Sequence, residues 1–274
     1  MLLLVAVTAV AQDSYREAMK DYLKISQKQA TEKMLTQLNQ LNPMLFEYKQ
    51  GLDYGQLTKR FINEHFLEVM TDMVQDVFKE NKITESDIRQ IIALMNTPQG
   101  ETLREHSAAW SNLFEAVVKE EMEQPLMSAM EGEPISSSVV VNADIPESYS
   151  RKFMQYFEDT RAMDQFMGAF NQPLKMMGIP ESFLEWLNNN IGTLAMNSAY
   201  GTITEADLDY SATLFNHDFY RHINDAAVML SDNIIKTGAT MILEYVDWMK
   251  DQGVPLSKMG EEGLKTIKSF NVEE

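Results

Sequence analysis

Two pairs of acidic residues are the first feature of the sequence that could carry chemistry. Glu85 and Asp87 lie in the hexamer ITESDI, and Glu205 and Asp207 lie in the related hexamer ITEADL, 120 positions later. Paired carboxylates can act as general acid and base, as they do in glycosidases. Acidic residues in a first helical turn also cap the helix and suit the positive end of its dipole. We interpret both pairs as helix caps.

Thr84 is predicted to cap a helix that begins at Glu85. Its hydroxyl can accept a hydrogen bond from the amide of Asp87, while the Asp87 carboxylate reaches back to the amide of Thr84. Ile83 and Ile88 can pack together as a hydrophobic staple. The second hexamer repeats each of these elements with Thr204, Asp207, Ile203 and Leu208.

The chain has four histidines, His65, His106, His217 and His222, and no cysteine. No HExxH motif occurs, and His217 and His222 lie on different faces of a helix, although Asp218 and His222 share one. The absence of cysteine excludes disulfides, thiolate nucleophiles and zinc–thiolate sites. The sequence also has no glycine-rich phosphate loop and no G-x-S-x-G elbow. It therefore predicts no catalytic, cofactor-binding or metal-binding residue.

The chain contains 20 methionines. Flexible thioethers suit a promiscuous apolar groove, and they equally suit an ordinary core, which is the interpretation that we favour. The methionines that fall on predicted apolar helix faces include Met70, Met73, Met163, Met167, Met176, Met177, Met196 and Met241.

An internal repeat organises the elements that carry these residues. The offset between the two hexamers continues without a gap and pairs apolar positions at helical spacing, namely Leu103 with Ile223, Trp110 with Leu230, Phe114 with Ile234 and Met122 with Ile242. Further upstream, Tyr15 and Tyr149 begin segments of similar spacing. Glycine (12) and proline (8) are scarce, which favours helices. The sequence predicts an all-α fold of two diverged tandem repeats of a multi-helix unit, packed together.

The first capped helix is expected to end near Asn96, because Pro98 disfavours helical geometry in the residue before it. Thr97 can cap a second, long helix that runs from Pro98 to about Gln124. In the second copy, the equivalent helix is expected to run from about residue 218 to residue 249 and to stop at a Gly-Val-Pro sequence.

Residues 131–146 (EGEPISSSVVVNADIP) break the helical pattern, and we interpret them as a linker. The three consecutive valines could pair as a lone strand, but they are too few to found a sheet. The predicted organisation is a signal peptide at 1–11, helical repeat 1 at 12–130, the linker at 131–146, helical repeat 2 at 147–253 and a C-terminal tail at 254–274.

The N-terminal sequence MLLLVAVTAV, followed by Ala11, resembles the apolar region and cleavage site of a secretory signal peptide. It lacks the usual preceding Lys or Arg, and a buried N-terminal helix is the alternative. The run is too short to span a bilayer, and no later segment is long and apolar enough to do so. We predict a periplasmic or secreted protein without a membrane span.

The net charge of −18 and the pI near 4.6 argue against nucleic acid and anionic lipid as partners. Both would require clustered Lys and Arg, and no basic run is longer than a pair.

A stretch within about residues 55–115 resembles the bacterial family called domain of unknown function 2059 (DUF2059). That family has a short acidic-capped helix that ends in an aromatic pair, followed by a Thr/Ser-Pro-x-Gly step into a long helix. The step is present here at residues 97–100 (TPQG), whereas Leu94 and Met95 replace the aromatic pair. The second copy keeps Phe215 but loses the Pro and Gly of the step, so it is a degenerate member. The resemblance implies a helical, usually exported protein and no particular activity.

These observations favour a non-enzymatic exported protein that binds a protein or a hydrophobic peptide in an apolar groove between the repeats. One alternative is an enzyme whose site is built from scattered carboxylates and histidines. Another is a purely structural envelope protein without a pocket. The sequence predicts no cofactor and no particular oligomeric state.

Overall fold

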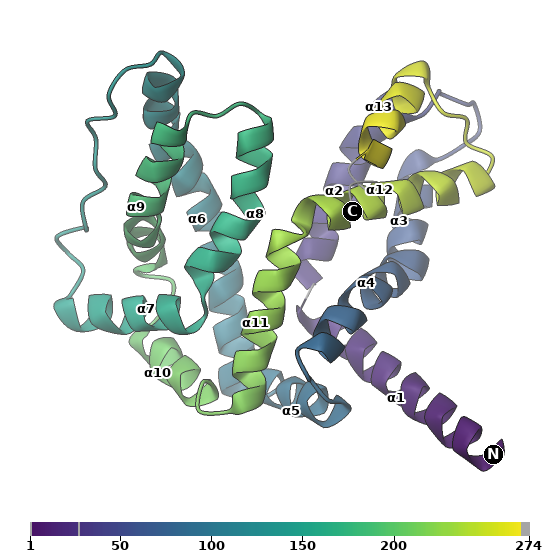
Figure 1. Cartoon of the computed structure of the whole chain (residues 1–274), viewed down its shortest axis with the longest axis horizontal. Helices are drawn as coiled ribbons and strands as arrows, with labels where there is room; N and C mark the ends of the chain where they lie inside the picture. The colour runs from purple at the N-terminus through teal and green to yellow at the C-terminus, as the bar shows by residue number, and fades with distance from the viewer. Residues whose placement is uncertain (1, 27, 270–274) are drawn as a thin grey trace. The chain divides into compact units, whose positions relative to one another are not determined.

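The computed structural model describes residues 2–26 and 28–269, without the side chains of 2–12, 28–30, 171–173, 176, 234, 235 and 269. The fold is all-α, as predicted, and the described part of the chain contains isolated β-bridges but no strand (Figure 1). The helices are α1 (Leu2–Ser26), α2 (Lys28–Leu45), α3 (Tyr54–Phe61), a π-helical turn (Ile62–Phe66), α4 (Leu67–Glu80), α5 (Glu85–Met95), α6 (Pro98–Met130), α7 (Glu147–Asp159), α8 (Ala162–Met176), α9 (Glu181–Ala199), α10 (Glu205–Leu214), α11 (Asp218–Asp232), α12 (Ile234–Asp251) and α13 (Lys258–Ser269).

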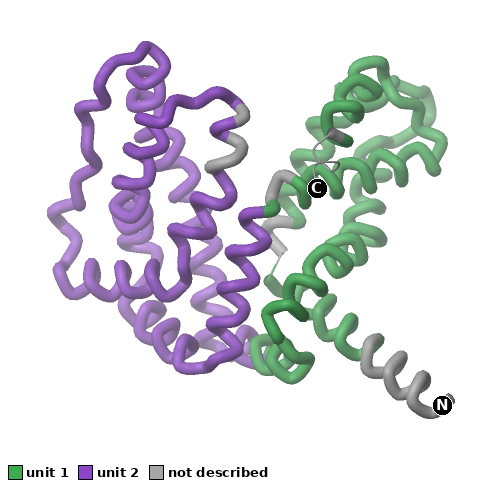
Figure 2. The backbone as a smooth tube through the Cα atoms, viewed as in Figure 1, with its two compact units in different colours: residues 1–92, 233–274 green, residues 93–232 purple. Residues whose placement is uncertain are grey.

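The chain forms two compact units (Figure 2). Unit 1 combines residues 1–92 with residues 233–274, and unit 2 is the continuous stretch 93–232. These units do not coincide with the predicted repeats. Helix α6, from the first predicted repeat, belongs to unit 2, whereas α12, from the second, belongs to unit 1. Each unit therefore contains helices from both halves of the sequence.

The core of unit 1 gathers aromatic side chains from α3 and α12 around a buried polar group. Tyr245 is fully buried, and its ring lies 5.0 Å from that of Phe61. The Tyr245 hydroxyl donates to Asn42 Oδ1 at 2.6 Å and lies 2.8 Å from the Thr58 hydroxyl. These mutual hydrogen bonds offset the cost of burying three polar side chains. Burial raises the pKa of Tyr245, although both hydrogen bonds oppose this shift.

The core of unit 2 is organised around α9, which is apolar on most of its faces, as expected for a central helix. Its buried apolar residues are Phe183, Leu184, Trp186, Leu187, Ile191, Leu194, Ala195, Met196 and Ala199. Side chains of α6, including Val117, Val118 and Met122, pack against this cluster. This packing explains why α6 lies in unit 2.

Both predicted capping boxes are confirmed. The amide of Thr84 donates to Asp87 at 2.8 Å, and the amide of Asp87 donates to the Thr84 hydroxyl at 3.2 Å. The corresponding distances between Thr204 and Asp207 are 2.7 and 3.2 Å. The four staple residues are all buried, at 3% exposure or less: Ile83, Ile88, Ile203 and Leu208.

The two copies also share a hydrogen bond between a tyrosine, on α1 or α7, and the residue before the capping threonine. The Tyr15 hydroxyl donates to the carbonyl of Ile83 at 3.2 Å, and the Tyr149 hydroxyl donates to that of Ile203 at 3.0 Å. The serine before each tyrosine donates to the first acidic residue of the hexamer, Ser14 to Glu85 and Ser148 to Glu205. Burial, with the nearby charge of Asp87, raises the pKa of Tyr15 to about 12. The shared spacing of these tyrosines therefore has a structural counterpart.

The long helices depart from their predicted ends. Thr97 caps α6 as predicted, accepting from the amide of Gly100 at 3.1 Å, but the helix continues to Met130 and includes Pro125. The continuous helix predicted for residues 218–249 is wrong, because Asn233 adopts a non-helical backbone (φ −100°, ψ 15°) and separates α11 from α12.

The predicted signal peptide comprises residues 1–11, and their side chains are outside the part of the chain that the structure describes. Within the described residues, no helix combines the length and apolarity that crossing a membrane requires.

Candidate functional site

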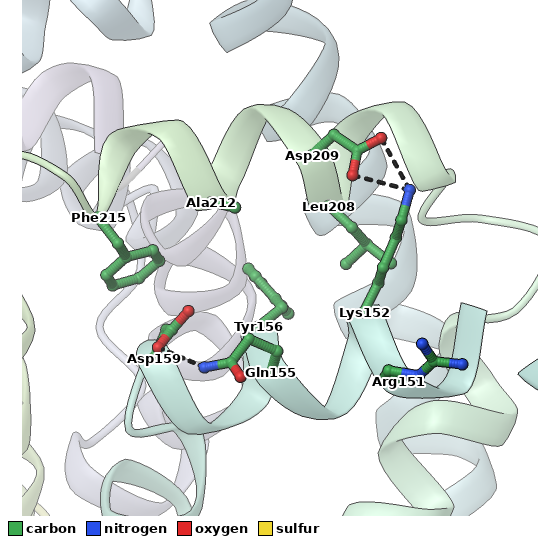
Figure 3. Close-up of a pocket in the computed structure, with 9 residues that line it drawn as sticks. All are labelled: Arg151, Lys152, Gln155, Tyr156, Asp159, Leu208, Asp209, Ala212 and Phe215. Carbon is green, nitrogen blue, oxygen red and sulfur yellow. Dashed lines mark hydrogen bonds and ion pairs between the residues drawn. The ribbon is translucent and has the colours of Figure 1, made fainter. Parts of the chain in front are cut away.

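A groove lies between α7 and α10, inside unit 2 (Figure 3). Its volume is about 250 Å³, below the range of roughly 300–1,000 Å³ that is usual for pockets that enclose a cofactor or a drug-sized ligand. It suits a single side chain of a larger partner better than a whole small molecule. We call it the α7–α10 groove, and it is lined by Arg151, Lys152, Gln155, Tyr156, Asp159, Leu208, Asp209, Ala212 and Phe215.

Helical spacing places these side chains on facing sides of two helices. Residues three and four apart share a helix face, so Lys152, Tyr156 and Asp159 all project from one side of α7. Leu208 and Ala212 are related in the same way on α10. The capping box fixes where α10 begins, and it thereby sets the register of its groove-lining residues.

The floor of the groove is apolar. Leu208 is buried, and Tyr156 and Phe215 are half-buried. The Tyr156 ring lies 6.0 Å from that of Phe153 and 6.4 Å from that of Trp110, and burial raises its pKa. Such a floor offers dispersion contacts and apolar surface rather than hydrogen bonds.

The rim of the groove is charged and largely paired. Lys152 contacts Asp209 at 2.8 Å and Glu205 at 3.0 Å, and these carboxylates raise the Lys152 pKa. Gln155 donates to Asp159 at 2.9 Å. Arg151 is exposed and has one long contact, 3.7 Å to Glu147. The rim therefore carries both signs of charge around an apolar floor, and interfaces between proteins likewise have a polar rim around an apolar centre.

Beside the groove, a histidine and an aspartate from distant parts of the chain form a pair. His106 Nδ1 lies 2.7 Å from Asp207 Oδ2, and the Asp207 side chain is 6% exposed. The same oxygen accepts from the Thr204 amide at 2.7 Å and the Thr204 hydroxyl at 2.6 Å. Burial opposes ionisation of Asp207, but the bonds from Thr204 and His106 outweigh it and lower the Asp207 pKa.

An Asp–His pair can orient an imidazole as a general base. Here, however, the carboxylate oxygen already caps α10, and His106 is not among the groove-lining residues. The pair satisfies a buried charge, which explains its geometry without chemistry.

The other three histidines are divided between the two units, with His65 in unit 1 and His217 and His222 in unit 2. His65 stacks with Phe61 in unit 1, and His217 stacks with Phe219 in unit 2. No histidine lines the α7–α10 groove. Within the described residues, no group of three or more His, Asp or Glu side chains could hold a metal ion.

A second cavity, of about 360 Å³, lies in unit 1. Its floor touches the buried Asn42–Thr58–Tyr245 network, and Tyr48 at its edge is 86% exposed. The cavity is lined by Asn39, Asn42, Pro43, Phe46, Tyr48, Tyr54 and Gly55.

The methionines fall both in the core and on the surface. Met196 and Met241 are buried, and Met70, Met73 and Met163 pack against the clusters of buried residues. The exposed methionines among the described side chains include Met44, Met127, Met130, Met154, Met177, Met229 and Met259. The side chain of Met176 lies outside those that the structure describes.

Comparison of the chain with protein-family models, with curated proteins and with solved structures found no match. The resemblance to DUF2059 therefore rests on the motif around the first capped helix alone.

Proposed function

We propose that this chain is an exported, non-enzymatic protein that binds a peptide segment of another protein through the α7–α10 groove. The observation that carries the proposal is a small groove with an apolar floor and a charged rim. The occupant is a segment that presents one large apolar side chain, such as Phe, Leu or Met, to Tyr156, Leu208 and Phe215. One further observation supports a binding role, because the Asp207 carboxylate is already engaged in capping α10.

Fluorescence anisotropy with labelled pentapeptides tests the groove. Peptides with Phe or Leu at the centre should bind about 10- to 100-fold more tightly than one with Gly, because burying such a side chain contributes roughly 1.5–3 kcal/mol. Ala212→Trp should fill the groove and abolish this difference. Ala206→Trp is the matched control, since Ala206 is exposed on the same helix and does not line the groove. Unchanged discrimination in Ala212→Trp would exclude this groove as the site.

The exported location has its own test. The N-terminal residue of the protein recovered from a bacterial periplasm should be Gln12, as determined by intact mass measurement. Recovery from the cytosol with residues 1–11 retained would contradict export.

A further inference from the structure

The linker between α6 and α7 is fixed to α9 through its main chain. Residues 133–142 are neither helix nor turn, and they follow an extended path past α9 (Figure 1). The Trp186 indole donates to the carbonyl of Ser137 at 2.6 Å, and the amide of Val139 donates to Asn190 Oδ1 at 2.8 Å. Side chains of α9 thus take the place of a neighbouring strand.

Asn197 continues this pattern two turns further along α9. Its Nδ2 donates to the carbonyl of Val140 at 2.9 Å, and its Oδ1 accepts from the amide of Asn142 at 3.0 Å. The main-chain groups that bond to α9 belong to residues 137 and 139 and then to residues 140 and 142. The alternation of a regular strand is therefore interrupted between Val139 and Val140, as it is at a β-bulge. Ile135 and Val139 meanwhile pack their side chains against the buried cluster of unit 2.

The opposite edge of this segment is open. The main-chain groups of Ser138 and Val141 have no hydrogen-bond partner among the described residues. Val140 and Val141 are 76% and 43% exposed, high values for β-branched apolar residues. An apolar edge with unpaired N–H and C=O groups is a template for a further strand.

The charged residues around the segment indicate which kind of peptide could bind to it. Residues 134–141 (PISSSVVV) carry no charge, and no Lys or Arg occurs between Lys119 and Arg151. Exposed acidic residues lie on both sides of the segment, with Glu131 and Glu133 before it and Asp144 and Glu147 after it. An edge of about six residues is also too short for the roughly 1,000 Å² that a specific interface between folded proteins buries.

We propose that residues 136–142 bind an extended peptide by strand addition, and that the peptide carries alternating apolar residues flanked by Lys or Arg. Main-chain pairing supplies the affinity in this mode, and side chains and flanking charges supply the preference. This surface is separate from the α7–α10 groove, so either proposal can fail without the other.

The test uses the fluorescein-labelled peptide Lys-Lys-Val-Thr-Val-Thr-Val-Lys-Lys and the full chain, with fluorescence anisotropy as the readout. An analogue N-methylated at every Val and Thr has the same charge but lacks the main-chain donors of both edges of its central stretch. It should bind about tenfold more weakly or worse, since one lost pair of hydrogen bonds corresponds to roughly that factor. Equal binding of the two peptides would overturn strand addition and leave charge attraction alone.

A pair of variants at one position locates the edge. Val141→Pro removes the N–H of residue 141 and should weaken binding about tenfold or more, whereas Val141→Thr keeps the N–H and should change it less than about threefold. Circular dichroism and thermal unfolding check that both variants fold. Equal affinity of the two variants would overturn the assignment. So would a concentration-dependent dimer of the unliganded chain that Val141→Pro dissociates, because the edge would then bind a second copy.

Discussion

At Asp207, one buried carboxylate oxygen accepts hydrogen bonds from the Thr204 amide, the Thr204 hydroxyl and His106. The first copy has the same cap at Asp87 and Thr84, but no histidine contacts it among the described residues. The cap of the second copy is thus contacted by a histidine that comes from α6, in the first predicted repeat, and its carboxylate is more buried than that of the first copy.

We expect His106→Ala to lower the free energy of unfolding by about 1.5–3 kcal/mol, the usual range for a hydrogen bond to a charged group. Urea unfolding at pH 7 measures the change. His217→Ala is the control, because His217 is exposed and its loss should cost less than about 0.5 kcal/mol. Similar losses in the two variants would mean that the pair with Asp207 contributes nothing.

The lowered pKa of Asp207 predicts a pH dependence of known sign. A carboxyl group whose native pKa lies below its unfolded value, about 3.9, stabilises the fold above that value and loses this contribution as pH falls through the native pKa. The stability difference between the native sequence and Asp207→Asn should thus shrink as the pH falls below about 4. Urea midpoints measured across this range give the curve, and a difference that grew on acidification would refute the assignment.

At the scale of elements, the turn from α5 into α6 depends on a close backbone contact. A Cβ atom on Gly100 would lie 2.1 Å from the carbonyl oxygen of Leu94, and backbone cannot yield as a flexible side chain would. Gly100→Ala should therefore destabilise the protein by more than about 1 kcal/mol, although alanine ordinarily favours a helix by about that amount. Gly238→Ala, in α12, has nothing within 4 Å of the new atom and should stabilise by about 0.5–1 kcal/mol. Thermal unfolding compares the two, and the prediction fails if both variants shift in the same direction.

What could be predicted from the sequence was local. The caps at Thr84, Thr97 and Thr204 were readable because a cap is decided within four residues. The break at Asn233 was missed because an apolar stripe continues on both sides of it. The His106–Asp207 pair and the α7–α10 groove join residues that are far apart in sequence, and no short-range pattern marks such contacts.

At the scale of the whole molecule, 41 acidic residues face 23 basic ones, so the folded chain carries a net repulsion. Raising NaCl from 10 to 200 mM screens this repulsion and should raise Tm by about 2–4 °C for each kcal/mol relieved. Calorimetry at pH 7 measures the shift. Near pH 4.6, the pI of the sequence, the net repulsion vanishes and attraction within ion pairs remains. Because salt screens that attraction, the same increase in salt should raise Tm little or lower it. A salt effect of equal size and sign at both pH values would rule out net charge as the cause.

Unit 1 is built from the two ends of the chain, so it cannot finish folding until the end of synthesis. Residues 93–232 emerge as one stretch, so unit 2 has all its helices before the ribosome reaches α12. Phe61 must wait for Tyr245 and Trp248, which follow it by about 185 residues, or roughly 9–37 s of translation at 5–20 residues per second. The first-made part of the chain thus stays unfinished until almost the last.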